Sequence, residues 1–152
     1  MIYSLEAPAS DADWQAFHDI RDAVLFKGRH RDVVYNRNHP DDFKPDNRPL
    51  LFKVDGQPLG VIRLDDFGDG TGAVRLVAIT QSEQGNGHGR VMSEMCDALA
   101  RGLGMHTLYV NAAPEALGYY DKLGWERFIW DPAELIEIAR DCEQMRKALI
   151  KD

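Results

Sequence analysis

The sequence has few cysteines, no long apolar run and no excess of positive charge. Cys96 and Cys142 are its two cysteines, too few for a disulfide framework and not in a metal-ligand spacing, so we interpret both as reduced core thiols. No apolar run approaches the roughly 18 residues of a membrane span, and the N-terminal residues lack the basic and apolar regions of a signal peptide. A formal charge of −7 argues against general binding to nucleic acids or anionic membranes. We therefore expect a cytoplasmic protein without a metal site.

Length and apolar content suit one domain over residues 1–152. The 152 residues are 44% hydrophobic, which is enough to bury a core without disulfides or metals. The acidic balance still allows an anionic small ligand at a locally positive site. An exposed sheet face or edge would allow a homodimer, although the sequence does not identify such a surface.

Hydrophobic periodicity predicts an α/β architecture. Strands are expected at residues 2–6, 50–54, 59–67, 73–79, 107–111 and 125–130, and helices at 10–25, 87–103 and 114–123. Ser10 is expected to cap the first helix, and Asp55-Gly56-Gln57-Pro58 to form a hairpin turn. Residues 27–49 are an unusually long polar connection, and such connections are often functional. The order of elements predicts a mixed, mostly antiparallel sheet with helices on both faces.

A glycine-rich loop, QGNGHGR at residues 84–90, precedes the second helix. Glycine at every second position indicates that the backbone must approach something closely or adopt positive φ. The first N–H groups of a helix have no internal partner and the helix dipole adds positive potential, so this loop suits a phosphate or pyrophosphate. Counted from Gly85, the nicotinamide fingerprint fails at Arg90, and Arg90-Val91 does not provide the end of a P-loop. The alternative is a flexible loop that only caps the helix.

Taken with its surroundings, the loop resembles the GNAT superfamily of acetyl-coenzyme A-dependent N-acetyltransferases. In that family a strand ending in an apolar-Ala-apolar triplet leads to Gln/Arg-x-x-Gly-x-Gly/Ala. Here Val77-Ala78-Ile79 leads to Gln84, Gly87 and Gly89 with the family's spacing. The resemblance covers residues 50–149 well and the first 49 residues in outline, and it implies the GNAT fold.

Two further segments carry the resemblance. LGYYDKLGW at 117–125 is similar to the family's Tyr-x-x-x-Gly-Phe/Trp segment, with Tyr120 as the tyrosine. QMRKAL at 144–149 resembles the closing strand of the family. Apolar residues at helical spacing favour one helix from 132 to 150, but the resemblance implies a short helix near 132–139 and a strand near 141–149. Sheet pairing can override local helical propensity, and we therefore expect the strand.

The resemblance implies that this protein uses acetyl-coenzyme A. In the family, loop amides bind the pyrophosphate, and backbone groups of the preceding strand and an Asn on the next strand bind the pantetheine arm. The cofactor-binding residues that this implies are Val77, Ile79, Gln84, Gly85, Gly87, His88, Gly89, Arg90 and Asn111. For the side chains of His88 and Arg90 we expect solvent exposure, with Arg90 also suited to the 3′-phosphate, and for those of Val77 and Ile79 core packing.

The resemblance also implies two catalytic roles. The N–H of Val77, on a strand with a β-bulge, would polarise the thioester carbonyl. Tyr120 would donate a proton to the leaving thiolate, whereas the adjacent Tyr119 points about 100° away around the helix. The simpler interpretation of Tyr120 is a packed core tyrosine, and that of Asn111 a strand-end cap.

The proton acceptor for the amine stays open at the level of the sequence. The candidates are Asp65, Asp66, His30, His39, Asp41 and Asp42. The leading hypothesis is transfer of an acetyl group to a primary amine of a small molecule or peptide, by direct attack in a ternary complex. The alternative is a module of the same fold that binds coenzyme A without efficient catalysis.

Overall fold

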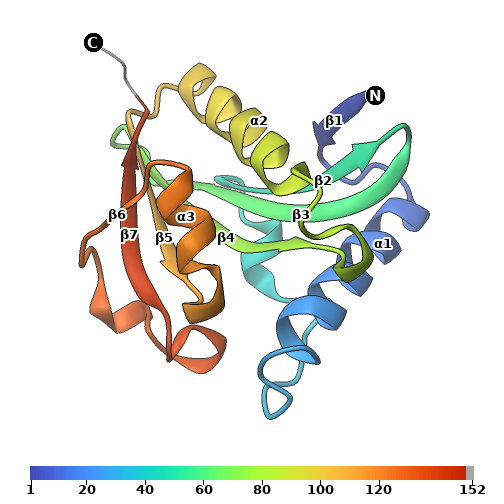
Figure 1. Cartoon of the computed structure of the whole chain (residues 1–152), viewed down its shortest axis with the longest axis horizontal. Helices are drawn as coiled ribbons and strands as arrows, with labels where there is room; N and C mark the ends of the chain where they lie inside the picture. Colours follow the sequence, from blue (N-terminus) through green and yellow to red (C-terminus); the bar gives the residue numbers. More distant parts are fainter. Residues whose placement is uncertain (150–152) are drawn as a thin grey trace.

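The structure, a computed structural model, describes residues 1–149, and its centre is one seven-stranded mixed sheet (Figure 1). The order across the sheet is β1-β2-β3-β4-β5-β7-β6. The pair β4–β5 is parallel and the other neighbouring pairs are antiparallel, as predicted. The strands are β1 (Tyr3–Glu6), β2 (Asn47–Val54), β3 (Gln57–Asp66), β4 (Thr71–Ile79), β5 (Thr107–Ala112), β6 (Glu126–Arg127) and β7 (Glu143–Ala148).

Helices cover both faces of the sheet, as the sequence predicts. α1 (Asp11–Arg21) lies on one side of β2–β4 and α2 (His88–Gly102) on the other, and α3 (Leu117–Lys122) packs on the side of α2 (Figure 1). Alternating strand residues divide the core accordingly. Leu51 and Val61 pack under α1, and Phe52 and Ile62 pack under α2. Within residues 1–149, no helix combines the length and the apolar character that crossing a membrane requires.

The predicted turn and cap form by local chemistry. Ser10 Oγ accepts a hydrogen bond from the Asp13 N–H at 3.1 Å and so caps α1. Asp55 and Gly56 have φ of 51° and 82°, the positive values of a tight turn between β2 and β3. α1 continues as one π-helical segment, η1 (Asp22–Phe26), so the helical pattern persists to the predicted end.

The C-terminal part is a strand, as the family resemblance implies. Met145 is fully buried and faces Val110 across the antiparallel β5–β7 pair. The local helical pattern is therefore wrong in residues 132–149, because pairing with β5 satisfies the backbone there; its last residue lies outside the described ones. The predicted short helix is two 3₁₀ turns, η5 (Pro132–Glu134) and η6 (Glu137–Ala139), and the predicted strand at 125–130 is reduced to β6. The remaining turns are η2 (Pro40–Phe43), η3 (Gln81–Glu83) and η4 (Pro114–Ala116).

The middle of the sheet is split. β4 pairs with β5 only from Thr71 to Val74, and beyond Val74↔Val110 the two strands diverge (Figure 1). On its other side β4 carries a bulge, where the register with β3 shifts and Leu76 adopts a φ of 53°. Leu76 and Val77 therefore have no ladder partner on either neighbouring strand. The predicted bulge is confirmed.

A row of buried ion pairs anchors the connection between α1 and β2 to the sheet. Asp42 is held by Arg21 Nη1 at 2.9 Å and by Arg63 Nη1 at 3.1 Å. Arg63 also donates two hydrogen bonds to Asp65, at 2.8 and 3.0 Å, and Arg75 Nε donates to Asp65 at 2.6 Å. Positive and negative groups alternate along the row, so each buried charge has a counter-charge.

Asp42→Asn should destabilise the fold by about 3 kcal/mol, because Arg21 and Arg63 would keep buried charges without a carboxylate between them. Urea unfolding at pH 7 measures this difference. Asp121→Asn, the matched control, breaks a half-exposed pair with Arg127 and should change stability by less than about 1 kcal/mol. Equal stabilities of the two variants would contradict the prediction.

The Asp42 effect should also depend on pH. Burial alone would raise the pKa of Asp42, but Arg21 and Arg63 together hold that pKa below its usual value. A carboxylate with a lowered pKa in the folded state stabilises the fold above its unfolded pKa of about 3.9. The difference between wild type and Asp42→Asn should thus be complete at pH 7 and shrink as the pH falls below about 4.

Candidate active site

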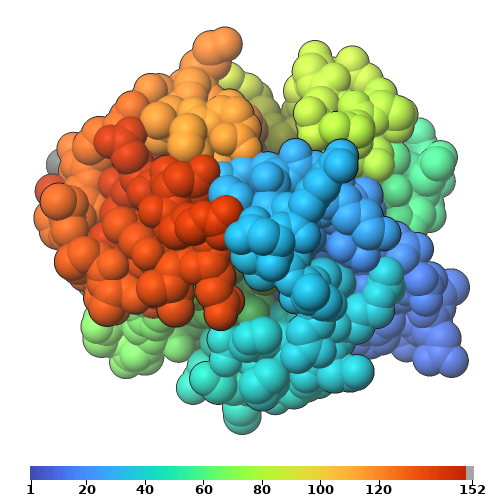
Figure 2. All heavy atoms as spheres, turned by 90° about the horizontal axis from the view of Figure 1, so that it is seen from below, coloured from blue at the N-terminus to red at the C-terminus, as the bar shows by residue number. Residues whose placement is uncertain are grey.

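The split in the sheet opens into a pocket of about 700 Å³. Its walls come from the bulged part of β4, the end of β5, α3, the segment that carries η5 and η6, and the connection after α1. Figure 2 shows that connection, in blue, lying against the orange-red C-terminal segment, with a notch beside them between α3 and the residues before α2. Segments far apart in the chain thus enclose one cavity.

Charged side chains hold the two walls together. Arg29 donates hydrogen bonds to Glu115 and to Asp141, the latter at 3.1 Å. Arg140 Nη2 lies 3.1 Å from both Asp32 Oδ1 and His30 Nδ1. These contacts join the connection after α1 to residues beside α3 and β7, and they fix the shape of the pocket.

The glycine loop ends in a row of unpaired amides. Among the described residues, no atom accepts a hydrogen bond from the backbone N–H groups of residues 85–90. The first backbone hydrogen bond of α2 is from Val91 N–H to Gly87 O, at 3.3 Å. Six consecutive donors at the start of a 15-residue helix, together with its dipole, provide an anion site.

Each glycine of the loop has an identifiable reason. Gly85 and Gly87 have φ of 84° and 82°, which side chains disfavour, and open space surrounds both. A Cβ on Gly89 would lie 2.9 Å from the Tyr119 ring, whose hydroxyl donates to Gly89 O at 2.7 Å. Gln84 Nε2 donates to Ile79 O at 2.9 Å and ties the loop to β4.

The expectation for the His88 side chain is wrong, whereas that for Arg90 is confirmed. His88 is 8% exposed and packs near Tyr3 and Phe52, with ring centroids 6.3 and 6.5 Å away. It turns inward because α2 lies on β1 and β2, a contact that the loop sequence does not reveal. Arg90 is exposed. Neither side chain lines the pocket, and His88 is not placed for proton transfer there.

Tyr120 lines the pocket and has its hydroxyl available. No described residue forms a hydrogen bond with this hydroxyl, and the ring packs edge-on against Trp125 at 5.5 Å. Burial, with smaller contributions from Tyr119 and two cysteines, raises the pKa of Tyr120 far above its usual range. The phenol is therefore neutral at physiological pH and can donate a proton. Tyr119 instead points at α2, and burial raises its pKa to about 12.

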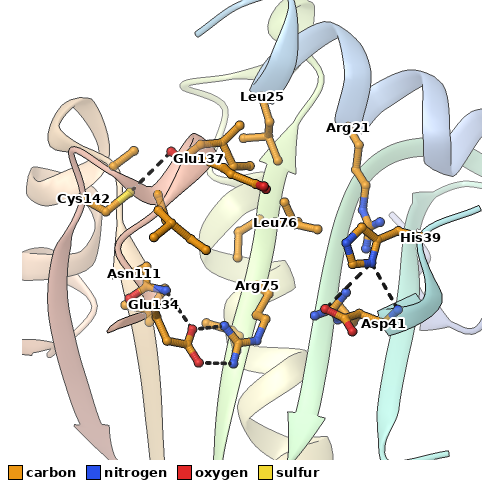
Figure 3. A pocket seen from close by; sticks show the side chains of 18 of the residues that line it. Arg21, Leu25, His39, Asp41, Arg75, Leu76, Asn111, Glu134, Glu137 and Cys142 are labelled. Carbon is orange, nitrogen blue, oxygen red and sulfur yellow. Dashed lines mark hydrogen bonds and ion pairs between the residues drawn. The ribbon is translucent and has the colours of Figure 1, made fainter. Parts of the chain in front are cut away.

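Val77 and Asn111 lie in the same pocket, whereas Ile79 and the loop residues lie outside its lining. The Asn111 side chain is not a strand-end cap. Its Nδ2 donates to Glu134 Oε1 at 3.2 Å and its Oδ1 accepts from Gln144 Nε2 at 2.9 Å. Figure 3 shows Asn111, Glu134 and Arg75 joined in this way at the base of the pocket.

The structure narrows the candidates for a proton acceptor. His39, Asp41 and Asp65 line the pocket, whereas His30, Asp42 and Asp66 do not. Asp65 already accepts hydrogen bonds from Arg63 and Arg75. The two candidates His30 and Asp42, which lie outside the lining, also have partners. His30 contacts Asp141 and Arg140, and Asp42 is paired with two arginines.

Side chains that the sequence did not single out also line the pocket. They include Arg21, Arg29, Arg75, Glu134 and Glu137. Cys142, expected as a core thiol, also lines the pocket and is half-buried. Arg75 makes a two-point contact with Glu134, and this pair joins β4 to η5 at the point where the split begins, next to Val74. No sequence motif marks these residues: Arg21 and Arg75 lie on α1 and β4, and the other residues lie on short turns and irregular segments. In residues 1–149 no group of His, Cys, Asp or Glu side chains is placed to hold a metal ion.

This geometry defines a class of protein. A split sheet that leads to unpaired helix amides is suited to an extended ligand with a phosphorylated end, such as an acyl carrier. The family description "Acetyltransferase (GNAT) family" matches residues 14–125. The chain therefore belongs to the GNAT family of acetyltransferases, and it is an acyltransferase.

Solved structures agree on the fold. An acyl-CoA N-acyltransferase from Pseudomonas aeruginosa is 20% identical, with a TM-score of 0.75, 97% of this chain covered and 99% of that one. An aminoglycoside 6′-N-acetyltransferase complexed with coenzyme A is 12% identical, with a TM-score of 0.79 and coverage of 100% and 99%. The PaiA N-acetyltransferase from Thermoplasma acidophilum, in complex with coenzyme A, is 11% identical, with a TM-score of 0.73 and coverage of 97% and 99%.

Two glycines of α2 should respond in opposite ways to alanine. Gly89→Ala should destabilise the protein by about 1–2 kcal/mol, because the Tyr119 ring must move and lose its hydrogen bond to Gly89 O. Gly102→Ala, in open space in the last turn, should stabilise it by up to about 1 kcal/mol. Urea unfolding of both variants tests this, and a Gly89→Ala protein as stable as wild type would contradict it.

Proposed function

We propose that this protein transfers the acetyl group of acetyl-coenzyme A to a primary amine of a small molecule or peptide, by direct attack in a ternary complex. The observation that carries this proposal is one continuous segment, residues 76–90. It begins in the pocket with Leu76 and Val77, which have no register partner on either neighbouring strand, and ends with the unpaired amides before α2. Such a path matches an acyl carrier with its thioester at one end and its phosphates at the other.

The phosphate end rests on the loop amides. In the proposal the N–H groups of Gly85, Gly87, His88, Gly89 and Arg90 bind the pyrophosphate, and Gln84 fixes the loop by its bond to Ile79 O. Arg90 is exposed beside these amides and is suited to the 3′-phosphate. His88 contributes its backbone alone, since its ring is buried.

The thioester end rests on the split. Val77 and Ile79 offer backbone groups to the pantetheine arm from β4. Asn111 offers its backbone from β5, because its side chain is occupied by Glu134 and Gln144. The Val77 N–H then stabilises the negative charge that develops on the thioester oxygen during attack. In this position a backbone donor needs no reorganisation, because the bulge already holds it without a ladder partner.

The chemistry proceeds by proton transfer and direct attack. The free amine attacks the thioester carbon, the N–C bond forms, and the C–S bond breaks with its electron pair going to sulfur. Tyr120 donates its proton to this sulfur, and the proton that the new amide nitrogen loses restores the phenol. Burial raises the pKa of Tyr120, so the phenol still carries its proton when the thiolate forms.

Coenzyme A and acetyl-coenzyme A should raise the melting temperature, because they bind the native state alone. At 100 times the dissociation constant, stabilisation of about 2.7 kcal/mol corresponds to a shift of about 5–10 °C for a domain of this size. NAD and ATP should produce no comparable shift. An unchanged melting temperature in the presence of coenzyme A would contradict the assignment of acetyl-coenzyme A as cosubstrate.

Tyr120→Phe should lower kcat by about 100-fold or more, because the leaving thiolate loses its proton donor. Release of free thiol over a panel of primary amines measures the rate, and the shift in melting temperature with coenzyme A should persist. Tyr109→Phe, outside the pocket lining, is the control and should keep the wild-type rate. Wild-type rates in Tyr120→Phe would exclude Tyr120 as the proton donor.

Binding of coenzyme A without thiol release for any amine would favour the alternative, a binding module without efficient catalysis.

A further inference from the structure

Glu137 is the one pocket-lining carboxylate that no described residue engages. Four acidic side chains line the pocket. Asp41 pairs with Lys44 at 2.9 Å, Asp65 with Arg63 and Arg75, and Glu134 with Arg75 and Asn111. The Glu137 side chain, by contrast, has no hydrogen bond or ion pair within residues 1–149. A carboxylate with free lone pairs can accept a proton, whereas one surrounded by guanidinium groups is a poor acceptor.

The backbone of Glu137 is in a conformation that its residue type disfavours. Its φ is 53°, in the left-handed region. Only three non-glycine residues in the described chain have positive φ. Asp55 belongs to the β2–β3 turn, where such values are expected, but Leu76 and Glu137 both line the pocket. Backbone strain of this kind concentrates at functional sites, so two cases on facing walls indicate that both positions are functional.

Glu137 lies opposite the bulge. Figure 3 shows its side chain reaching from the C-terminal segment across the pocket toward Leu76, with Leu25 above it. Val77, whose N–H is assigned to the thioester oxygen, is the next residue after Leu76. Glu137 is also exposed to solvent, so a proton on its carboxylate can pass to water. The carboxylate therefore faces the region where an incoming amine would meet the thioester.

The charged groups around Glu137 are neutralised by other partners. Those that line the pocket on α1, the connection after it, β4 and η5 are Arg21, Arg29, Arg75 and Glu134, and those that adjoin it are Glu115, Arg140 and Asp141. Arg21 pairs with Asp42, Arg29 with Glu115 and Asp141, Arg75 with Glu134, and Arg140 with Asp32. Among the pocket-lining carboxylates of the described residues, Glu137 thus carries the one negative charge without an ionic partner.

The other acceptors in the pocket are occupied. His39 Nδ1 accepts the Asp41 N–H at 3.2 Å, so the neutral ring carries its proton on Nε2 and offers a donor there. The Lys44 ammonium, by its hydrogen bond and its charge, lowers the pKa of Asp41, which weakens Asp41 as a proton acceptor. Cys142 is half-buried, and burial raises the pKa of its thiol.

We propose that Glu137 is the catalytic proton acceptor, an inference that rests on the proposed function. The substrate enters as an ammonium ion, and one oxygen of Glu137 takes one of its protons. The neutral amine then attacks the thioester carbon as described above, and the protonated Glu137 releases its proton to water. One ammonium and one thioester yield one amide, one thiol and one proton, so the step balances without a further reactant.

Glu137→Gln tests the proposal by its pH dependence. At pH 7, kcat/KM should fall about 1,000-fold, because the variant depends on amine that is already neutral in solution, about one molecule in a thousand for a pKa of about 10. Its rate should rise about tenfold per pH unit and approach the wild-type rate near the pKa of the amine, about 10 for an alkyl amine. The wild-type profile should be flatter. Glu94→Gln, an exposed residue of α2 outside the pocket, is the matched control and should follow the wild type.

A second variant, Glu137→Gly, distinguishes the loss of the carboxylate from a folding defect. Glycine adopts the φ of 53° readily, so this variant should melt no lower than wild type while losing activity as Glu137→Gln does. Wild-type rates in either variant would overturn the proposal. So would a loss confined to KM with an unchanged pH profile, since that would make Glu137 a binding residue.

The same assay separates this proposal from the proposed function. Both Glu137 variants should retain the rise in melting temperature with coenzyme A. If the wild type releases thiol and the variants match it, only the Glu137 assignment fails. If the wild type neither releases thiol with any amine nor is stabilised by coenzyme A, the proposed function fails and the assignment fails with it.

Discussion

The loss of pairing between β4 and β5 beyond Val74↔Val110 is the constraint on which the rest of the structure depends. A parallel pair that continued would fill the middle of the sheet, and no pocket would form. Once the strands diverge, Leu76 and Val77 have no register partner on β5, and both line the pocket. The bulge shifts the register between β4 and β3, so these two residues have no partner on β3 either. The ligand path and the pocket are two consequences of the same interruption.

A split sheet also needs something to hold its halves in place. Ion pairs do this here: Arg75 joins β4 to Glu134, and Arg29 joins the connection after α1 to Asp141. These pairs fix the walls, and they also consume most of the acids in the pocket, since an oxygen bound by a guanidinium has little basicity left. The division leaves Tyr120 and Glu137 without partners among the described residues. The Tyr120 hydroxyl keeps its proton because burial raises its pKa, and the Glu137 carboxylate has free lone pairs.

The sequence predicted features whose cause is local. The Ser10 cap, the turn at Asp55-Gly56 and the start of α2 at the glycine loop follow from the chemistry of a few neighbouring residues. Predictions failed where distant packing decides. Residues 132–149 have helical spacing, but pairing with β5 makes the last part a strand. His88 follows a glycine and looks exposed, but α2 presses its ring against β1 and β2.

By itself the sequence determined the order of the elements, the glycine loop and the tyrosine of α3, because each depends on spacing within one segment. It did not decide which carboxylate is free. Asp65 and Glu137 are both acidic residues, and nothing in the sequence distinguishes their availability. Only the fold places two arginines on Asp65 while leaving Glu137 unpaired in the described structure. Ionic partners come from elements far apart in the chain, so the availability of a proton acceptor is a property of tertiary packing. The tertiary structure therefore decided the chemistry of the pocket, on a backbone path that the sequence had already specified.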